Sequence, residues 1–411
     1  MVDAIINFII NYKFVILFYL LIAIFIVVKW KKIDSQAKIL LLYRTKFGIT
    51  FINKVVKKYR EWVILLGYIG VGMGYIGLIF ISGVLLKNLY DVLFVANSTA
   101  GVSVVLPGVN VPGIGVLPFW YWLIALFFIA LIHEFGHAVV AMAHKIKLDS
   151  TGIAFIGPII GAFVEPNNKQ MSKQSDIVKY SVMAAGPFFN FLLAALAILL
   201  LKFAFFPLQE MMVEQDGFTF SEYVNESYPA AVEGLPLDTA IMGIDGIETT
   251  TFYDFAEVLT CKSPGDQVTV SSFDEEGNEK DYILTLISNP DDESKGFMGI
   301  NSIQNNVKVK EPYTSGIGEV AYYTLDWFNG MSNGGKGFFF WLYLLSLGIG
   351  MFNLLPLGIT DGGQMLQLTL SRTHGIKKGN KRFKQVSLLF LVILLLNLIL
   401  PFAKNLIMSL I

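Results

Sequence analysis

The feature that most constrains this sequence is an ionisable cluster inside a long apolar segment. Residues 117–143 read LPFWYWLIALFFIALIHEFGHAVVAMA and contain the cluster His133-Glu134-Phe135-Gly136-His137. At about 1.5 Å per residue, a helix of this length crosses a bilayer core of about 30 Å. Ionisable groups at such a depth are costly, and they persist where they line a cavity, pair with one another or bind an ion. The segment therefore predicts a membrane-spanning helix that carries a functional site.

The spacing within the cluster is that of a zinc-binding helix. Residues four apart share a helix face, so His133 and His137 can hold one Zn²⁺ while Glu134 projects beside them. The same pattern occurs by chance in soluble helices, where the histidines are surface or capping residues. Here only four histidines occur in the whole chain. Two of them at ligand spacing within a span favour a metal site.

The composition is that of a polytopic membrane protein. Of 411 residues, 54% are hydrophobic and 15% are charged, which is unlike a soluble globular domain. The single cysteine, Cys261, excludes an internal disulfide and argues against thiolate ligation of zinc. The basic runs flank apolar segments without forming a recognisable module, so no nucleic-acid partner is expected.

Hydropathy predicts about six transmembrane helices, over residues 4–28, 62–86, 117–143, 180–201, 337–357 and 386–407. Residues 29–60 carry ten basic side chains and one acid, which predicts a cytoplasmic loop. Both chain termini are then expected on the extracytoplasmic side of the membrane. The compact, Lys- and Ile-rich chain suggests a prokaryotic cell membrane. In the second span, Gly70 and Gly74 form a small-xxx-small pair typical of close helix packing.

An apolar stretch at residues 152–165 is too short and too interrupted by Gly and Pro to span a bilayer. Such backbone is tolerated at membrane depth where it is buried in protein or lines a wet cavity. We interpret it as a re-entrant strand pair beside the site, with a packed loop as the alternative. Its edge could receive an extended substrate as an added strand, and the residues concerned are Gly161, Ala162, Phe163, Val164 and Glu165.

Residues 207–335 differ in kind, with five lysines against 23 acids and frequent turn signals. This composition predicts a water-soluble, β-rich domain on the extracytoplasmic side. The run from Tyr228 to Pro236 and the strand after it resemble the carboxylate-binding turn and following strand of a PDZ domain. Such a domain would receive peptide termini.

A catalytic zinc site needs a third protein ligand and an open position. Asp361 and Glu165 are the acids nearest membrane depth, and the helix broken by Pro356 makes Asp361 the better candidate. Glu134 would then remain outside the ligand set and accept a proton from water. Asn190, inside a span, is either interhelical glue or an amide that holds the substrate or an oxyanion.

Four ordered motifs carry a resemblance over most of residues 117–400: HEFGH at 133–137, GPIIGAFVE at 157–165, AAGPFFN at 184–190 and NLLP with DGG at 353–363. Together they resemble the site-2 protease family of intramembrane zinc metalloproteases. The resemblance implies zinc ligation by the residues at positions 133, 137 and 361, one Zn²⁺ per chain, catalysis by Glu134 and substrate contact by Asn190. It also implies a PDZ domain between the core spans, and cleavage of single-span membrane proteins after a first cut outside. Many members have Leu where this chain has Thr360.

The predicted organisation has four parts: residues 1–116 with two helices, 117–206 as the first catalytic part, 207–315 as the PDZ-like domain, and 316–411 as the second catalytic part with a final helix. Three functions fit a membrane zinc site. The first is an intramembrane zinc endopeptidase acting in regulated proteolysis. The second is a non-hydrolytic zinc-binding receptor or scaffold, which has no need of a base such as Glu134. The third is an ion transporter, which would require further polar groups in the spans.

Overall fold

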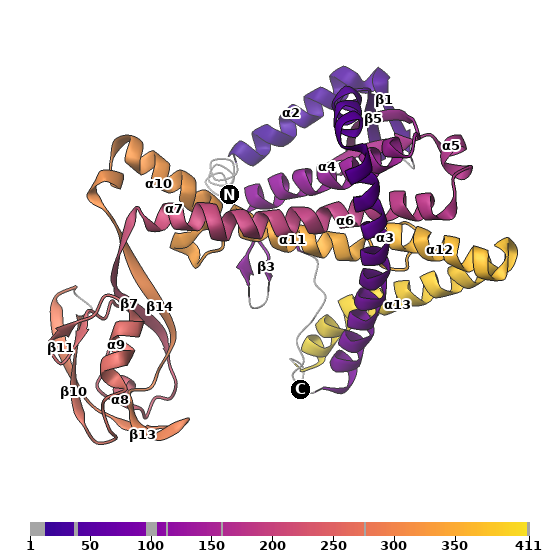
Figure 1. Cartoon of the computed structure of the whole chain (residues 1–411). Coiled ribbons are helices and arrows are strands. Elements are labelled where there is room, and N and C mark those ends of the chain that lie inside the picture. Colours follow the sequence, from indigo (N-terminus) through magenta and orange to yellow (C-terminus); the bar gives the residue numbers. More distant parts are fainter. Residues whose placement is uncertain are drawn as a thin grey trace, which may run out of the picture. The chain divides into compact units, whose positions relative to one another are not determined.

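The structure is a computed structural model that describes residues 13–36, 40–95, 105–111, 114–157, 159–274 and 277–408. The chain forms two compact units (Figure 1). The membrane unit comprises Met1–Leu201 and Gly335–Ile411, and the inserted unit comprises Lys202–Gly334. The inserted unit extends on both sides of residues 207–315, because helices at each end pack with it.

Within the described residues, five helices are long and apolar enough to cross a membrane: Lys13–Lys32, Ile49–Phe94, Phe119–Ala143, Asp176–Glu210 and Ile376–Pro401. The first predicted span begins at residue 4, and residues 4–12 lie outside the described part. The fifth predicted span, 337–357, contains α11 (Phe338–Phe352), which has 15 residues. At about 22 Å this helix is shorter than a bilayer core, so the count of six spans stays a prediction.

The longest helix, α3 (Ile49–Phe94), approaches its neighbours through a face made of glycine. It has 46 residues, a length of about 69 Å, and its backbone departs from helical geometry at Tyr59. Four of its glycines are buried at intervals of three or four residues: Gly67, Gly70, Gly74 and Gly77. A Cβ on Gly67 would lie 2.5 Å from Ser181 Oγ, and one on Gly77 would clash with Leu354. The close packing predicted from the glycine spacing is thus confirmed.

The membrane unit also contains a four-stranded antiparallel sheet in the order β1-β2-β5-β6. Its strands are β1 (Ile33–Gln36), β2 (Leu40–Thr45), β5 (Leu148–Ile156) and β6 (Ile159–Pro166). The predicted strand pair is present as β5 and β6, and its re-entrant position stays a prediction. The segment 29–60, predicted as a cytoplasmic loop between two spans, contains β1 and β2, which complete the sheet against β5. The side of the membrane on which this segment lies stays a prediction. In β2, Leu42 is buried and the other residues are half-buried.

The described residues of the membrane unit form further helices besides α3. They are α2 (Lys13–Lys29), α4 (Phe119–Ala143), α5 (Asn168–Ser172), α6 (Asp176–Leu200), α11, α12 (Asp361–His374) and α13 (Ile376–Met408). A small hairpin of β3 (Asn110–Val111) and β4 (Gly115–Val116) precedes α4. A hydrogen bond between two amides joins α3 to α13, since the half-buried Asn88 donates from Nδ2 to Oδ1 of the buried Asn397 over 2.7 Å. Neighbouring helices satisfy one another's polar groups in this way where water is absent.

The inserted unit is built around a compact apolar core. Its strands are β7 (Val213–Tyr223), β8 (Gly243–Ile244), β9 (Ile247–Glu248), β10 (Gln267–Phe273), β11 (Glu279–Thr285), β12 (Ile287–Asn289), β13 (Asp292–Phe297) and β14 (Ile300–Val309). Its helices are α7 (Phe206–Glu210), α8 (Pro229–Val232), α9 (Phe252–Leu259) and α10 (Gly316–Asn329). A sheet of order β11-β10-β8-β9 and the β7-β14 pair enclose the fully buried Phe218, Phe220 and Phe255.

The predicted carboxylate-binding role of the turn from Tyr228 to Pro236 is contradicted by its hydrogen bonds. Ala230 N donates to Met298 O, and Leu235 N donates to Ala230 O. The four amides between them also donate to carbonyls within the turn. Ala230 and Leu235 are fully buried in the core. Every amide from 230 to 235 is therefore already engaged, so this turn cannot bind a peptide carboxylate through its backbone.

The glycine face of α3 predicts a sharp difference between two substitutions. Gly77→Leu places a side chain against Leu354, whereas Gly72→Leu points where no described heavy atom lies within 4 Å of the new Cβ. Overpacking a tight contact costs about 1–3 kcal/mol. We expect Gly77→Leu to lower the unfolding temperature of the detergent-solubilised protein, and Gly72→Leu to leave it unchanged. Equal stability of the two variants would contradict this packing.

Candidate metal centre

Two imidazoles of α4 and one carboxylate of α12 converge in the membrane unit. His133 Nε2 lies 3.1 Å from His137 Nε2 and 3.1 Å from Asp361 Oδ2, and His137 Nε2 lies 3.5 Å from Asp361 Oδ1. One ligand atom from each side chain lies within 4.8 Å of the other two. Ligands at about 2.0–2.1 Å in a tetrahedral site lie about 3.4 Å apart. The three residues therefore have the donor types and the spacing of a zinc site.

A glycine on α6 leaves room for an ion beside the imidazoles. A Cβ built on Gly186 would lie 2.5 Å from His133 Nε2 and would also clash with His137 Nε2. Both Nε2 atoms thus face the space above the Gly186 backbone, which any other residue would fill. Gly186 belongs to the AAGPFFN motif, but the sequence analysis did not identify its role.

The other ring nitrogen of each histidine is held by α6. His137 Nδ1 lies 2.7 Å from the Val182 carbonyl oxygen, an acceptor, so Nδ1 carries the hydrogen and Nε2 keeps its lone pair. His133 Nδ1 lies 3.2 Å from Asn190 Nδ2. Asn190 is fully buried, and its Oδ1 has no partner among the described residues. Exchanging the amide oxygen and nitrogen of Asn190 would let Oδ1 accept a hydrogen bond from His133 Nδ1–H. The buried Oδ1 would then have a hydrogen-bond partner.

The Asn190 side chain therefore contacts the ring nitrogen of His133 that does not face the other two candidate ligands. Its backbone carbonyl accepts a hydrogen bond from Ser346 Oγ over 2.9 Å, which ties α6 to α11. This arrangement combines the interhelical role weighed for Asn190 with support of His133. The substrate or oxyanion role of Asn190 stays a prediction.

The start of α12 sets the position of Asp361. Thr360 is the N-cap residue, and its Oγ1 accepts from Gly363 N over 3.2 Å and donates to Leu355 O over 2.6 Å. A Cβ on Gly362 or Gly363 would clash with carbonyls of the preceding turn. Thr360 thus caps the helix that carries Asp361, and the glycines let its first turn pack closely.

Glu134 lies outside the ligand group, on the wall of a large cavity. Its Oε2 accepts a hydrogen bond from Val164 N of β6 over 2.9 Å. The cavity has a volume of about 1300 Å³ and is bounded by α4, the start of α3 near Phe51, and strands β2, β5 and β6. Of the proposed substrate-strand region, the residues from Gly161 to Val164 line the same cavity. A carboxylate that is not a ligand thus lies between the ion site and a space large enough for a peptide segment.

Glu165, the alternative third ligand, is engaged elsewhere. Its carboxylate accepts hydrogen bonds from Arg44 of β2 and Ser150 of β5. Arg44 also pairs with Asp34 of β1 over 3.3 Å. The hydrogen bond that Arg44 donates to the Glu165 carboxylate raises the pKa of the Arg44 guanidinium. These contacts join all four strands, and no sequence pattern had suggested a partner for Arg44.

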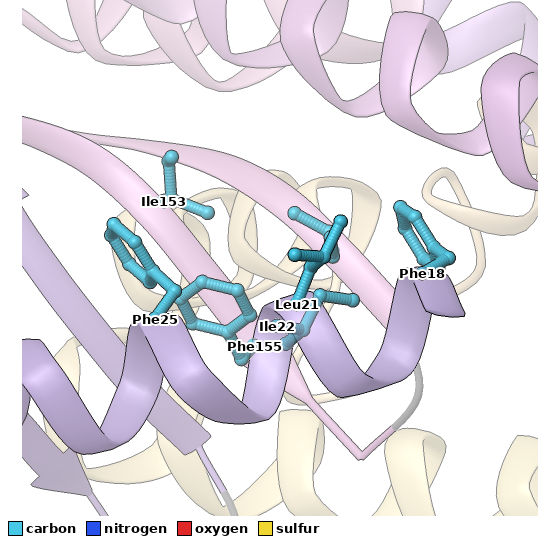
Figure 2. Close-up of a pocket in the computed structure, with 7 residues that line it drawn as sticks. Phe18, Leu21, Ile22, Phe25, Ile153 and Phe155 are labelled. Carbon is cyan, nitrogen blue, oxygen red and sulfur yellow. The ribbon is translucent and has the colours of Figure 1, made fainter. Parts of the chain in front are cut away.

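A second, apolar cavity of about 290 Å³ lies between α2 and the β5-β6 pair (Figure 2). Figure 2 shows Phe18, Leu21, Ile22 and Phe25 of α2 beside Ile153 and Phe155 of β5. Phe25 and Ile153 line the larger cavity as well. None of the described residues of α2 is buried. This helix therefore contributes Phe25 to the wall of the larger cavity without burying any of its described side chains.

Comparison with known proteins gives a family match over the whole site. The model of peptidase family M50 matches residues 121–398. Zinc metalloprotease RasP of Shouchella clausii is 22% identical over 247 residues, covering 53% of this chain and 56% of that protein. The uncharacterized protein MJ0971 of Methanocaldococcus jannaschii is 24% identical over 323 residues, covering 78% of this chain and 75% of that protein. This chain thus spans little more than half the length of the RasP relative.

One solved structure is similar to part of the chain. The PDZ domain of an SdrC-like protein from Listeria monocytogenes has 22% sequence identity and a TM-score of 0.19, and covers 21% of this chain and 86% of that domain.

The space above Gly186 generates a direct test of the ion site. Gly186→Ala places a methyl group against His133 and His137. We expect zinc affinity to fall by more than about 100-fold, since even changes that only support ligands cost about 10- to 100-fold. Gly348→Ala is the matched control, because no described heavy atom lies within 4 Å of its Cβ. Equal zinc content of the two purified variants would refute the placement.

The cap of α12 generates a second test. Thr360→Ala removes the acceptor for Gly363 N, which costs about 1 kcal/mol of stability and loosens Asp361. We expect zinc affinity to fall by about 10-fold. Thr360→Ser keeps the hydroxyl and should retain near-normal zinc affinity. Competition titration with a chelator measures both, and a Ser variant as weak as the Ala variant would contradict the capping role.

Proposed function

The chain belongs to peptidase family M50, and from this premise we propose that it is an intramembrane zinc endopeptidase. It would hydrolyse peptide bonds in or near the transmembrane segments of membrane-anchored proteins. The observation that carries the proposal is the convergence of His133, His137 and Asp361, with Glu134 beside them and outside the ligand group. A zinc-binding receptor or scaffold needs the three ligands but gains nothing from Glu134.

His133, His137 and Asp361 would hold one Zn²⁺ per chain. When bound, zinc supplies Lewis acidity, which polarises a carbonyl group and lowers the pKa of water. Glu134 accepts the proton of the attacking water and passes it to the leaving amine. Val182 and Asn190 keep the two imidazoles oriented. Most of the side chains that line the cavity are apolar.

The shape of the cavity supports an extended, apolar substrate. The residues from Gly161 to Glu165 lie on the last strand of the sheet, so a substrate segment unfolded from its helix could add to this edge. Within the proposal, single-span membrane proteins reach the larger cavity past α2, where Phe25 lines both cavities. Lipid contacts the apolar outer faces of the spanning helices.

The inserted unit would act outside the membrane. Its excess of acids over lysines supports an extracytoplasmic position, and the ten basic residues of 29–60 support a cytoplasmic position for the sheet. A PDZ-like fold would allow the unit to receive peptide termini left by a first cut outside the membrane. The hydrogen bonds from Ala230 to Leu235 exclude their backbone amides as the binding element.

Purified protein in detergent, incubated with a panel of single-span reporter proteins, tests this function. Glu134→Gln should reduce cleavage by about 10²- to 10⁴-fold while zinc stays bound. Asp361→Ala should lower both zinc content and cleavage, because one of three ligands is lost. Mass spectrometry of the fragments locates the cut and metal analysis reports the zinc. Undiminished cleavage by Glu134→Gln would remove the proposal.

A further inference from the structure

The carboxylate proposed as the base is hydrogen-bonded to the strand proposed to receive the substrate. Val164 N of β6 donates to Glu134 Oε2 over 2.9 Å. On one side β6 pairs with β5. On its other side, no strand within the described residues pairs with β6. The Glu134 side chain therefore engages the open edge of the sheet.

The register of the sheet shows which way this amide points. Val164 lies opposite Thr151 of β5. Residues of an antiparallel pair alternate between those that exchange hydrogen bonds with the neighbouring strand and those whose amide and carbonyl point away from it. Since the Val164 amide donates to Glu134, Val164 is a residue whose amide and carbonyl point away from β5. Ala162, two residues earlier, points its amide and carbonyl the same way. These are the backbone groups to which an added strand would bind.

We propose that the Glu134 carboxylate accepts the hydrogen bond that the Val164 amide would otherwise donate to a substrate carbonyl. A substrate strand that adds to β6 must therefore displace the Glu134 side chain. The displaced carboxylate is then free to act as the base. This inference rests on the proposed function and adds a coupling between substrate binding and the availability of the base. Binding would be sensed through the peptide backbone, because a backbone carbonyl competes for Val164 N–H whatever the side chains are.

The surroundings favour movement of the side chain over movement of the strand. Glu165, the next residue of β6, is held by Arg44 and Ser150. β6 is also paired with β5 along its length. Glu134 projects from α4 through three rotatable bonds and accepts a hydrogen bond from the Val164 amide of β6. Rotation of the Glu134 side chain can therefore release the amide without disturbing the sheet.

Two variants of Glu134 separate the competition from catalysis. Both Glu134→Ala and Glu134→Gln lack the base, so a bound reporter stays intact. The Gln amide oxygen can still accept from Val164 N–H, whereas Ala cannot. With both proteins loaded with zinc, we expect Glu134→Ala to bind the fluorescently labelled reporter that the wild-type protein cleaves about 2- to 10-fold more tightly than Glu134→Gln. Equal affinities, or tighter binding by Glu134→Gln, would overturn the inference.

Val164→Pro provides the control, because proline lacks the N–H and is tolerated on an edge strand where the N–H faces outward. In this background the affinities of Glu134→Ala and Glu134→Gln should become equal. A difference that persists would assign the effect to the smaller Ala side chain and overturn the inference. Zinc content of the Val164→Pro proteins reports whether the site remains folded.

Hydrogen exchange decides the question without any substrate. In the zinc-loaded, reporter-free proteins, the Val164 amide should exchange faster in Glu134→Ala than in Glu134→Gln, because only Gln retains an acceptor. Equal exchange rates would contradict the inference even if Val164→Pro fails to fold. Failure of the proposed function has a different signature: the wild-type protein then cleaves no reporter, whatever the exchange rates are.

Discussion

Everything in the membrane unit depends on two imidazoles and a carboxylate meeting where water is scarce. Unpaired polar groups are expensive in such surroundings, and here His133, His137 and Asp361 approach one another within hydrogen-bonding distance. This requires α6 to press its backbone against the imidazoles, which is possible because position 186 is glycine. The same helix accepts a hydrogen bond from His137 at Val182 O. One helix thus both orients the ligands and limits the space left for the ion.

The chemistry of the site could be predicted from the sequence because local spacing carries it. Two histidines four residues apart share a face in any helix, so His133 and His137 required no tertiary information. Asp361 required a second signal, the polar break near Pro356 in an otherwise apolar segment. The group His133, His137 and Asp361 does lie together, although their roles and that of Glu134 stay predictions.

What the sequence analysis missed depends on contacts between distant segments. Leu40–Thr45 pairs with β5 as a strand, and its sequence, LLLYRT, does not indicate a partner more than 100 residues away. The turn from Tyr228 to Pro236 has the composition of a binding loop, yet Ala230 and Leu235 are buried in the core. Asn190 could be placed in a span but not behind His133. In each case propensity and composition were overridden by tertiary packing.

The backbone of α3 departs from helical geometry at Tyr59, yet the chain before and after that residue packs against α4 in one apolar cluster. Before it, the residues around Phe51 form the rim of the large cavity. After it, the glycines from Gly67 to Gly77 interlock with α6 and with the turn that leads into α12. Ile52 and Val56 share one apolar cluster with Val139 and Ala141 of α4, the helix that carries His133 and His137. The rim of the cavity is therefore fastened to the same packed core that positions two of the three ligands.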